Sequence, residues 1–131
     1  ACLAQAAYEG SGHTQIVVAL HARQEEVFLG TYVVTDGIAS ASANEMVVDV
    51  KDIAQTLTDD WIGVGDGWIL REQLETAFKA EMQNVTMDVY PDPEALLNLG
   101  IDGFKSGRSI DALNARPKYL REHVATPSKN L

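Results

Sequence analysis

The chain has 131 residues, 46% of them hydrophobic, and a formal net charge of −9. This length suits one domain, and the apolar content is enough to fill one core. Acidic residues outnumber basic ones 19 to 10, which argues against nucleic-acid binding by this chain alone, because Lys and Arg must neutralise the phosphates. No apolar run reaches the ~20 residues of a membrane-spanning helix and no signal peptide is visible, so we expect a cytoplasmic protein.

The residues that commonly bind metals are sparse in this sequence. Cys2 is the only cysteine, so an internal disulfide cannot form. His13, His21 and His123 are far apart and lack the spacing of metal ligands. We therefore expect no metal and no cofactor.

The chain opens without an initiator Met, inside a helical pattern. Residues 1–9 are rich in good helix formers, and Gly10 is a natural helix stop. We expect residues 1–11 to be the end of a helix from a missing N-terminal half. Residues 12–124 then form one subdomain, and residues 125–131 form a frayed tail.

Three strands are predicted next. Residues 15–21 are almost continuously apolar, which is typical of a strand buried on both faces. Residues 27–34 form the second strand, and Asp36-Gly37 marks a hairpin to a third strand within residues 38–48.

Helices and strands alternate in the rest of the chain. Asp49 is placed to cap a helix that continues to Leu57, and residues 61–65 form a short strand. A helix over residues 68–82 and a half-exposed strand over residues 85–89 follow. The helix apolar side is predicted to consist of Leu70, Leu74, Ala77 and Phe78.

The last helix begins at Asp92-Pro93, a cap followed by proline in the first turn. Its apolar side is predicted to consist of Ala95, Leu96, Leu99 and Phe104. Residues 117–121 are the last recognisable element. The element order predicts an α/β fold, a ribonuclease-H-like subdomain of the actin-like and sugar-kinase-like ATPase type, with a mixed five-stranded sheet and flanking helices.

Candidate catalytic groups are few. A nuclease on this fold needs several converging carboxylates, and the first strand supplies none. Residues 63–67 resemble a phosphate loop, but no Lys-Ser or Lys-Thr follows, so we favour a tight turn in which Gly65 and Gly67 are structural. His21 lacks the partners of a catalytic triad and is interpreted as structural.

Charged residues mark the predicted hairpin tip. Arg23, Glu25 and Glu26 are either solvated surface charges or a contact for a protein partner. Near the end of the chain, Tyr119 is interpreted as a packing residue, and Arg121 as the partner of an acidic residue in the same domain.

Three segments resemble the TsaB family, also called YeaZ. Residues 21–28 resemble its Asp-Ala-Arg-x-x-Glu-Val-Tyr/Phe hairpin, residues 64–68 its glycine turn, and residues 117–121 its Pro-x-Tyr-Leu-Arg element. The resemblance covers essentially all of residues 1–124. His21 departs from it, since the family commonly has Asp there, and the family's N-terminal half is absent.

The resemblance implies a non-catalytic scaffold in threonylcarbamoylation of the tRNA adenosine next to the anticodon. Family members pair with TsaD, which transfers the group, and TsaE, an ATPase, joins them. They also form homodimers, and some are labelled resuscitation-promoting factors. Two alternatives stay open: a peptidase or ATPase of the glycoprotease-like superfamily, and a generic protein-interaction domain.

Overall fold

A mixed sheet of six strands forms the centre of the molecule. The computed structural model describes residues 1–121, so the tail expected at residues 125–131 lies outside the described residues. The strand order is β3-β2-β1-β5-β6, and β4 also pairs with β2. The first strands are antiparallel, whereas β5 and β6 run parallel to β1. The strands are β1 (Gln15–Arg23), β2 (Glu26–Thr35), β3 (Ile38–Ala41), β4 (Met46–Asp49), β5 (Ile62–Val64) and β6 (Asn84–Thr86).

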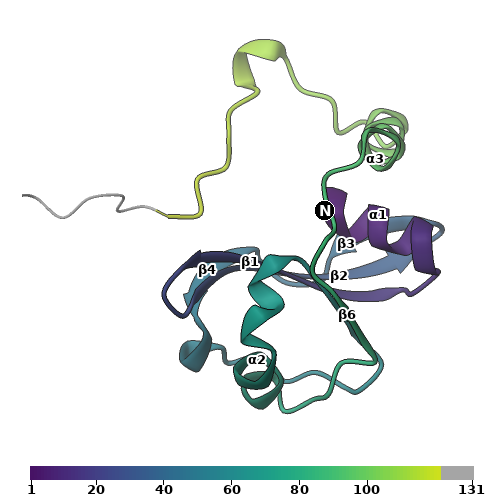
Figure 1. Cartoon of the computed structure of the whole chain (residues 1–131). Helices are drawn as coiled ribbons and strands as arrows, with labels where there is room; N and C mark the ends of the chain where they lie inside the picture. The colour runs from purple at the N-terminus through teal and green to yellow at the C-terminus, as the bar shows by residue number, and fades with distance from the viewer. Residues whose placement is uncertain (122–131) are drawn as a thin grey trace, which may run out of the picture.

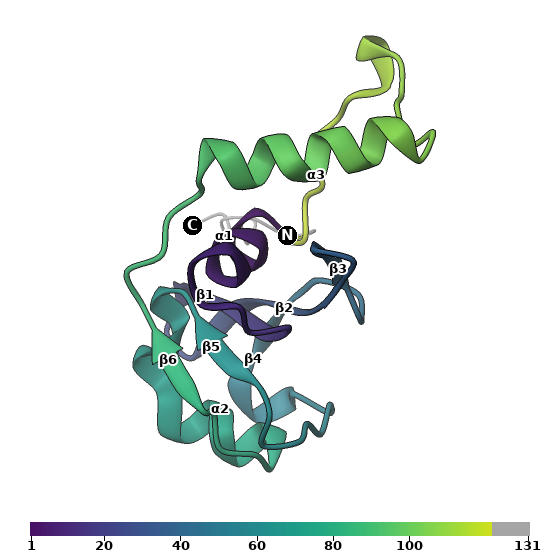
Figure 2. The same ribbon diagram turned by 90° about the vertical axis from the view of Figure 1, so that its right-hand side faces the viewer.

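Helices cover both faces of this sheet. The helix α1 (Cys2–Ser11) lies on one face and α2 (Arg71–Phe78) on the other (Figure 1). The helix α3 (Pro93–Lys105) lies on the far side of α1, which therefore separates it from most of the sheet (Figure 2). The arrangement confirms the predicted ribonuclease-H-like α/β class. Among residues 1–121, no helix has the length and apolarity needed to cross a membrane.

The core consists of two layers, one on each face of β1. Ile16 packs in the cluster that contains Leu3 of α1, whereas the next residue, Val17, packs in the cluster that contains Leu74 of α2. Both β1 residues are fully buried. The prediction of a strand buried on both faces is confirmed, and this strand joins the two layers.

The predicted third strand is two strands, so the expected count of five was wrong. The strand β3 pairs with the last residues of β2, and β4 pairs with its first residues. At the junction, the Ser42 hydroxyl donates to the Thr31 carbonyl oxygen at 3.1 Å, and the Ser42 amide donates to the same oxygen at 2.8 Å. These bonds extend the pairing of β3 with β2 by one residue, and β4 pairs with the other end of β2.

The helix predicted over residues 49–57 was also wrong beyond its first turn. Asp49 does cap a turn by accepting from the Lys51 amide, but that turn, η1 (Val50–Asp52), is a single turn of 3-10 helix. Further on, the Leu57 amide donates to the Phe78 carbonyl oxygen at 3.0 Å. Since Ile53 and Leu57 pack against the core from extended chain, tertiary packing overrides the helical spacing.

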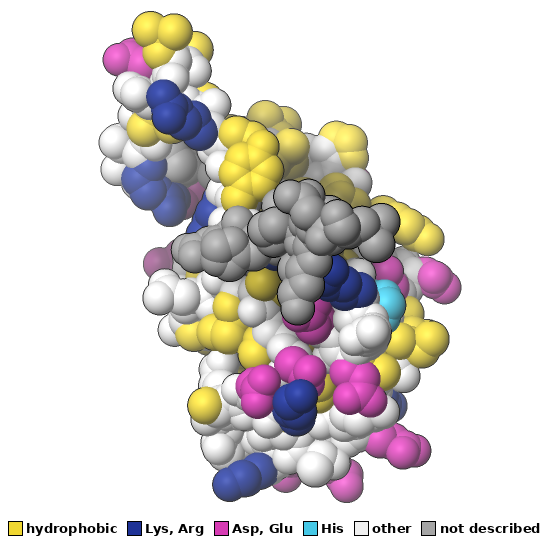
Figure 3. Space-filling view, turned by 90° about the vertical axis from the view of Figure 1, so that its left-hand side faces the viewer, with side chains coloured by type: hydrophobic (Ala, Val, Ile, Leu, Met, Phe, Trp, Pro, Cys, Tyr) yellow, Lys and Arg dark blue, Asp and Glu magenta, His cyan; other side chains and the backbone are white. Residues whose placement is uncertain are grey.

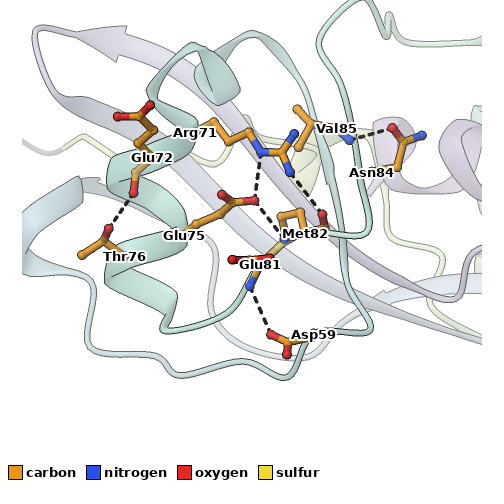
Figure 4. Close-up of polar contacts among 9 residues, drawn as sticks. All are labelled: Asp59, Arg71, Glu72, Glu75, Thr76, Glu81, Met82, Asn84 and Val85. Carbon is orange, nitrogen blue, oxygen red and sulfur yellow. Dashed lines mark hydrogen bonds and ion pairs between the residues drawn. The ribbon is translucent and has the colours of Figure 1, made fainter.

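The helix predicted over residues 68–82 is shorter than expected. A 3-10 segment, η2 (Asp66–Leu70), precedes α2, which ends because Lys79 adopts a left-handed conformation with φ 56°. Leu74 and Phe78 are buried as predicted. Glu75 then anchors the turn that follows: its Oε1 accepts from Arg71 Nε and from the Met82 amide, both at 2.9 Å (Figure 4).

Several element ends differ from the prediction. The helix α1 ends at Ser11, in agreement with the predicted range 1–11, but the glycine that caps it is Gly12 and not Gly10: Gly12 has φ 76° and its amide donates to the Tyr8 carbonyl oxygen. The strand predicted over residues 85–89 shrinks to β6, and Met87 is exposed. Near the end of the described chain is one more 3-10 turn, η3 (Ala112–Asn114).

The last helix starts as predicted but packs differently. Asp92 accepts from the Ala95 amide at 2.9 Å, which confirms the cap. Of the expected apolar side only Ala95 is fully buried, whereas Leu96 and Phe104 are 61% and 77% exposed. Tyr119, predicted to pack, is 80% exposed, so that prediction was wrong.

Candidate protein-interaction surface

The tip of the β1–β2 hairpin gathers the predicted contact residues. The strands pair up to Arg23 and Glu26, with Gln24 in a left-handed conformation at φ 52°. Arg23 Nε lies 3.2 Å from Glu26 Oε2. The Glu25 carbonyl oxygen accepts from the Val50 amide, and this bond joins the turn to η1. A hollow of about 540 Å³ beside the tip is lined by Arg23, Gln24, Glu25, Glu26, Asp49 and Lys51.

A residue from the end of the described chain joins this tip. The Arg121 guanidinium donates to Glu26 Oε2 at 2.8 Å. Arg121, and after it Arg23, hold the pKa of Glu26 below its usual range. Arg121 thus pairs with an acidic residue of the same domain, as predicted.

Residues 118–121, here called the C-terminal strap, have a second anchor. Lys118 Nζ lies 3.1 Å from Glu45 Oε2, and Glu45 also accepts a short hydrogen bond from the Tyr32 hydroxyl. That hydroxyl lowers the pKa of Glu45, while burial and the Glu45 carboxylate raise the pKa of Tyr32. Between the two anchors, Leu120 lines a largely apolar cavity of about 250 Å³ next to α1. Two ion pairs and one apolar contact therefore hold the strap beside the sheet.

The glycine turn after β5 is filled by the protein itself. Gly65 has φ 105°, and a Cβ there would lie 2.4 Å from the Ala19 carbonyl oxygen. A Cβ on Gly67 would lie 2.8 Å from the same backbone oxygen. Asp66 Oδ1 accepts from the His21 amide at 2.9 Å. Close backbone packing thus explains both glycines, and a carboxylate occupies the turn where a phosphate loop needs free N–H groups.

The remaining polar candidates contact backbone carbonyl oxygens. His21 Nε2 lies 3.1 Å from the Gln24 carbonyl oxygen, and the Ser11 hydroxyl donates to the Ala7 carbonyl oxygen. Cys2 Sγ lies 3.5 Å from the Asp92 carbonyl oxygen. Within residues 1–121, no three His, Cys, Asp or Glu side chains are grouped so that they could hold a metal ion.

Acidic side chains are numerous on the surface. Figure 3 shows several of them on the face it presents, with basic side chains between them. Lys51 belongs to such a group: its ammonium lies 3.2 Å from Asp49 Oδ2, which raises the pKa of Lys51. A mixed but mainly acidic surface suits contact with a basic protein partner.

A second exposed surface was missed by the sequence analysis. The helix α3 carries four exposed large hydrophobic residues, Leu96, Leu97, Ile101 and Phe104, and Ile101 also lines a hollow with Gln5 and Tyr8 of α1. Leu96 and Phe104 belong to the apolar side that the sequence predicted, whereas Leu97 and Ile101 were missed, although their i, i+4 spacing is that of one helix side. A helix that is apolar on two sides is typically buried on both.

Comparison with known proteins places the chain beside TsaB and YeaZ. The chain is 28% identical to the tRNA threonylcarbamoyladenosine biosynthesis protein TsaB of Escherichia coli (strain K12) over 127 residues, which cover 94% of the chain and 54% of that protein. YeaZ from Pseudomonas aeruginosa matches with a TM-score of 0.80 and 29% identity, covering 92% of this chain and 56% of that one. No protein-family model matches.

A second solved structure from Pseudomonas aeruginosa, described as similar to the peptidase YeaZ, has a TM-score of 0.82 and 30% identity over the same shares of the two chains. The resemblance to TsaB and YeaZ that the sequence motifs indicated is therefore confirmed. The chain spans about half the length of these relatives.

Proposed function

We propose that this chain is part of a non-catalytic scaffold subunit in the biosynthesis of threonylcarbamoyladenosine in tRNA. The observation that carries the proposal is the similarity to Escherichia coli TsaB over 94% of the chain. The subunit acts in the cytoplasm by binding homologues of TsaD and TsaE, and the intact protein pairs with a second copy of itself.

A scaffold role agrees with the way the candidate catalytic groups are used. The Asp66 carboxylate binds the His21 amide, and the glycine turn packs against the backbone of β1. These groups therefore stabilise the join between β1 and β5. The same groups would have to be free for nucleotide or peptide chemistry.

The hairpin tip is the proposed contact with TsaD. It is a charged turn whose backbone is bonded to η1 and whose Glu26 side chain is bonded to the C-terminal strap. Fixed charges at an interface rim favour the correct partner and speed association. Because this chain has a net charge of −9, we assign the binding of the tRNA phosphates to the partner.

The test is binding of the 131-residue chain to Escherichia coli TsaD, measured by calorimetry. We expect binding that weakens at least tenfold in the double variant Arg23→Glu/Glu25→Lys. The control is Glu81→Lys, an exposed charge reversal outside the hairpin tip, which should leave the affinity unchanged. Absence of binding by the wild-type chain would overturn the proposed contact. Turnover of ATP or peptide that is lost in Asp66→Ala would replace the scaffold by an enzyme.

A further inference from the structure

The C-terminal strap is held by its side chains, in the way a bound peptide can be held. Within residues 1–121, no backbone hydrogen bond joins the strap to the rest of the chain, and the strap adds no strand to the sheet. Lys118 and Arg121 each bind a carboxylate, and Leu120 lines the apolar hollow between them. A segment held in this way can leave its place without breaking any strand pairing.

The segment that leads to the strap is exposed along its whole length. Residues 106–119 are exposed, and their regular structure is the single turn η3. Figure 1 shows this segment looping away from the sheet before the chain returns to it. Chain with few buried contacts opens at little cost in free energy. The segment therefore tethers the strap to the fold without fixing its position.

Beneath the strap, the protein presents a groove with a carboxylate at each end and an apolar hollow in the middle. Glu45 binds the start of the strap and Glu26 binds its end. The hollow has a volume of about 250 Å³ with the strap in place, and Leu20, Phe28 and Leu29 are among its lining residues. These five residues define what we call the strap groove.

The strap leaves part of this hollow open. Leu120 is half-buried and lines the remaining space instead of filling it. The aromatic residue of the strap, Tyr119, is 80% exposed and contributes little to the contact. An aromatic side chain in the place of Leu120 would bury more apolar area, which favours binding. The strap groove is therefore suited to a larger anchor than the one the strap provides.

We propose that the strap groove is a recognition site for an extended segment of a partner protein, which displaces the strap. The segment has the pattern basic-x-aromatic-basic, so that its two cations bind Glu45 and Glu26 and its aromatic ring enters the hollow. The net charge of −9 attracts such a basic segment at longer range. The C-terminal strap is then an autoinhibitory contact that keeps the groove closed until this partner binds.

Competition with the tethered strap sets the affinity that the partner needs. A segment on a short flexible tether is present at an effective concentration of ~1 mM. The hold of the strap is weak for that concentration, because the Lys118 side chain is 66% exposed and exposed ion pairs contribute little. A partner with the same two charges and a better apolar anchor therefore has the advantage.

The test is the binding of a fluorescein-labelled peptide, Arg-Pro-Lys-Tyr-Phe-Arg, to the 131-residue chain, measured by fluorescence anisotropy. The peptide repeats residues 116–121 with Phe in the place of Leu120. We expect Leu120→Asp to bind it at least tenfold more tightly than the wild-type chain does, because the altered strap no longer competes. Arg121→Glu releases the other end of the strap and should have the same effect, which covers a poorly folded Leu120→Asp. The same peptide with Leu for Phe should bind more weakly.

A charge exchange locates the bound peptide. Glu26→Arg, added to Leu120→Asp, should weaken binding at least tenfold, and a peptide that ends in Glu should regain the lost affinity. Glu81→Lys, an exposed charge reversal outside the groove, is the control and should change nothing. Failure of both strap variants to bind more tightly, indifference to Glu26→Arg, or equal affinity for the Phe and Leu peptides would each overturn the proposal. None of these measurements contains TsaD, so their outcome is separate from that of the proposed TsaD contact.

Discussion

Arg121 and Glu26 are 95 residues apart in the chain, yet the Arg121 guanidinium donates to Glu26 Oε2 at 2.8 Å. The bond joins the C-terminal strap to the tip of the first hairpin. Arg23 Nε lies 3.2 Å from the same carboxylate oxygen. The Glu26 carboxylate therefore binds two guanidinium groups, one from the same hairpin and one from the C-terminal strap.

The first prediction concerns the protonation of Glu26. Arg121 is the larger cause of its lowered pKa and Arg23 the smaller. We expect Arg121→Ala to raise the pKa of Glu26 toward its ordinary value by more than Arg23→Ala does. The measurement is a titration of the Glu26 side-chain carboxyl by NMR. A larger effect of Arg23→Ala would show that the strap does not hold the tip in solution.

The same pair predicts the pH dependence of the strap. A carboxyl with a lowered folded pKa stabilises the fold above its unfolded pKa, and this contribution disappears as the pH falls through the folded pKa. Glu26→Gln should therefore lower the Tm at neutral pH and lose its effect in acid. Glu25→Gln, the neighbouring charge at the tip, serves as the control. If the lower Tm of Glu26→Gln persists in acid, it comes from changed packing and not from the loss of the ionised carboxyl.

A second prediction concerns two glycines with opposite surroundings. At Gly65 the conformation is left-handed and a Cβ would collide with the backbone of Ala19, so Gly65→Ala should lower the free energy of unfolding by about 2 kcal/mol or more. Gly100 lies inside α3 in open space, so Gly100→Ala should raise it by about 0.5–1 kcal/mol. Urea unfolding measures both. Equal effects of the two substitutions would mean that the packing around β5 relaxes freely.

The elements that the sequence predicted correctly are those in which local signals and tertiary packing agree. The apolar run of β1, the Asp36-Gly37 turn and the Asp92 cap are all local patterns that the fold also needs. At Asp36 and Gly37, φ values of 52° and 80° are those the hairpin turn requires. Because the local sequence preference and the tertiary packing agree at these positions, the sequence alone predicts them.

The failures have a common physical cause, which is packing between distant segments. Residues 53–57 have helical spacing, but the Leu57 amide bonds to Phe78, 21 positions away. The third strand of the prediction divides into β3 and β4, which pair with opposite ends of β2. At the candidate contact surface, the charges of the hairpin tip could be predicted, and so could an acidic partner for Arg121. That this partner is Glu26 required the three-dimensional arrangement.

A third prediction concerns Gln5, a polar residue that is only 1% exposed in α1. Its Oε1 accepts from the Ala39 amide at 2.8 Å, and its Nε2 donates to the Gly37 carbonyl oxygen at 2.9 Å. Gln5→Leu should lower the free energy of unfolding by about 2–3 kcal/mol, because two backbone groups of the β2–β3 turn lose their partners. Guanidinium unfolding provides the measurement, with Gln55→Leu, a part-buried glutamine bonded at 3.4 Å, as the milder control. A neutral result at Gln5 would mean that water replaces both bonds.

The last prediction concerns Tyr32, whose hydroxyl bonds to Glu45 beneath the C-terminal strap. Tyr32→Phe keeps the buried ring but removes this bond, so we expect the pKa of Glu45 to rise and the free energy of unfolding at pH 7 to fall by about 1 kcal/mol.

The pH dependence of this loss has a definite sign. Because the folded pKa of Glu45 is below its unfolded value, the ionised carboxyl stabilises the fold at pH 7, and that contribution vanishes as the pH falls through the folded pKa. The difference in the free energy of unfolding between wild type and Tyr32→Phe should therefore shrink in acid. Urea unfolding at pH 7 and at an acid pH measures this difference. The control is Tyr90→Phe, at a tyrosine that is 75% exposed. It should change neither the pKa of Glu45 nor the free energy of unfolding. A difference that stays constant from neutral pH into acid would place the effect in the packing of the ring instead of in the bond to Glu45.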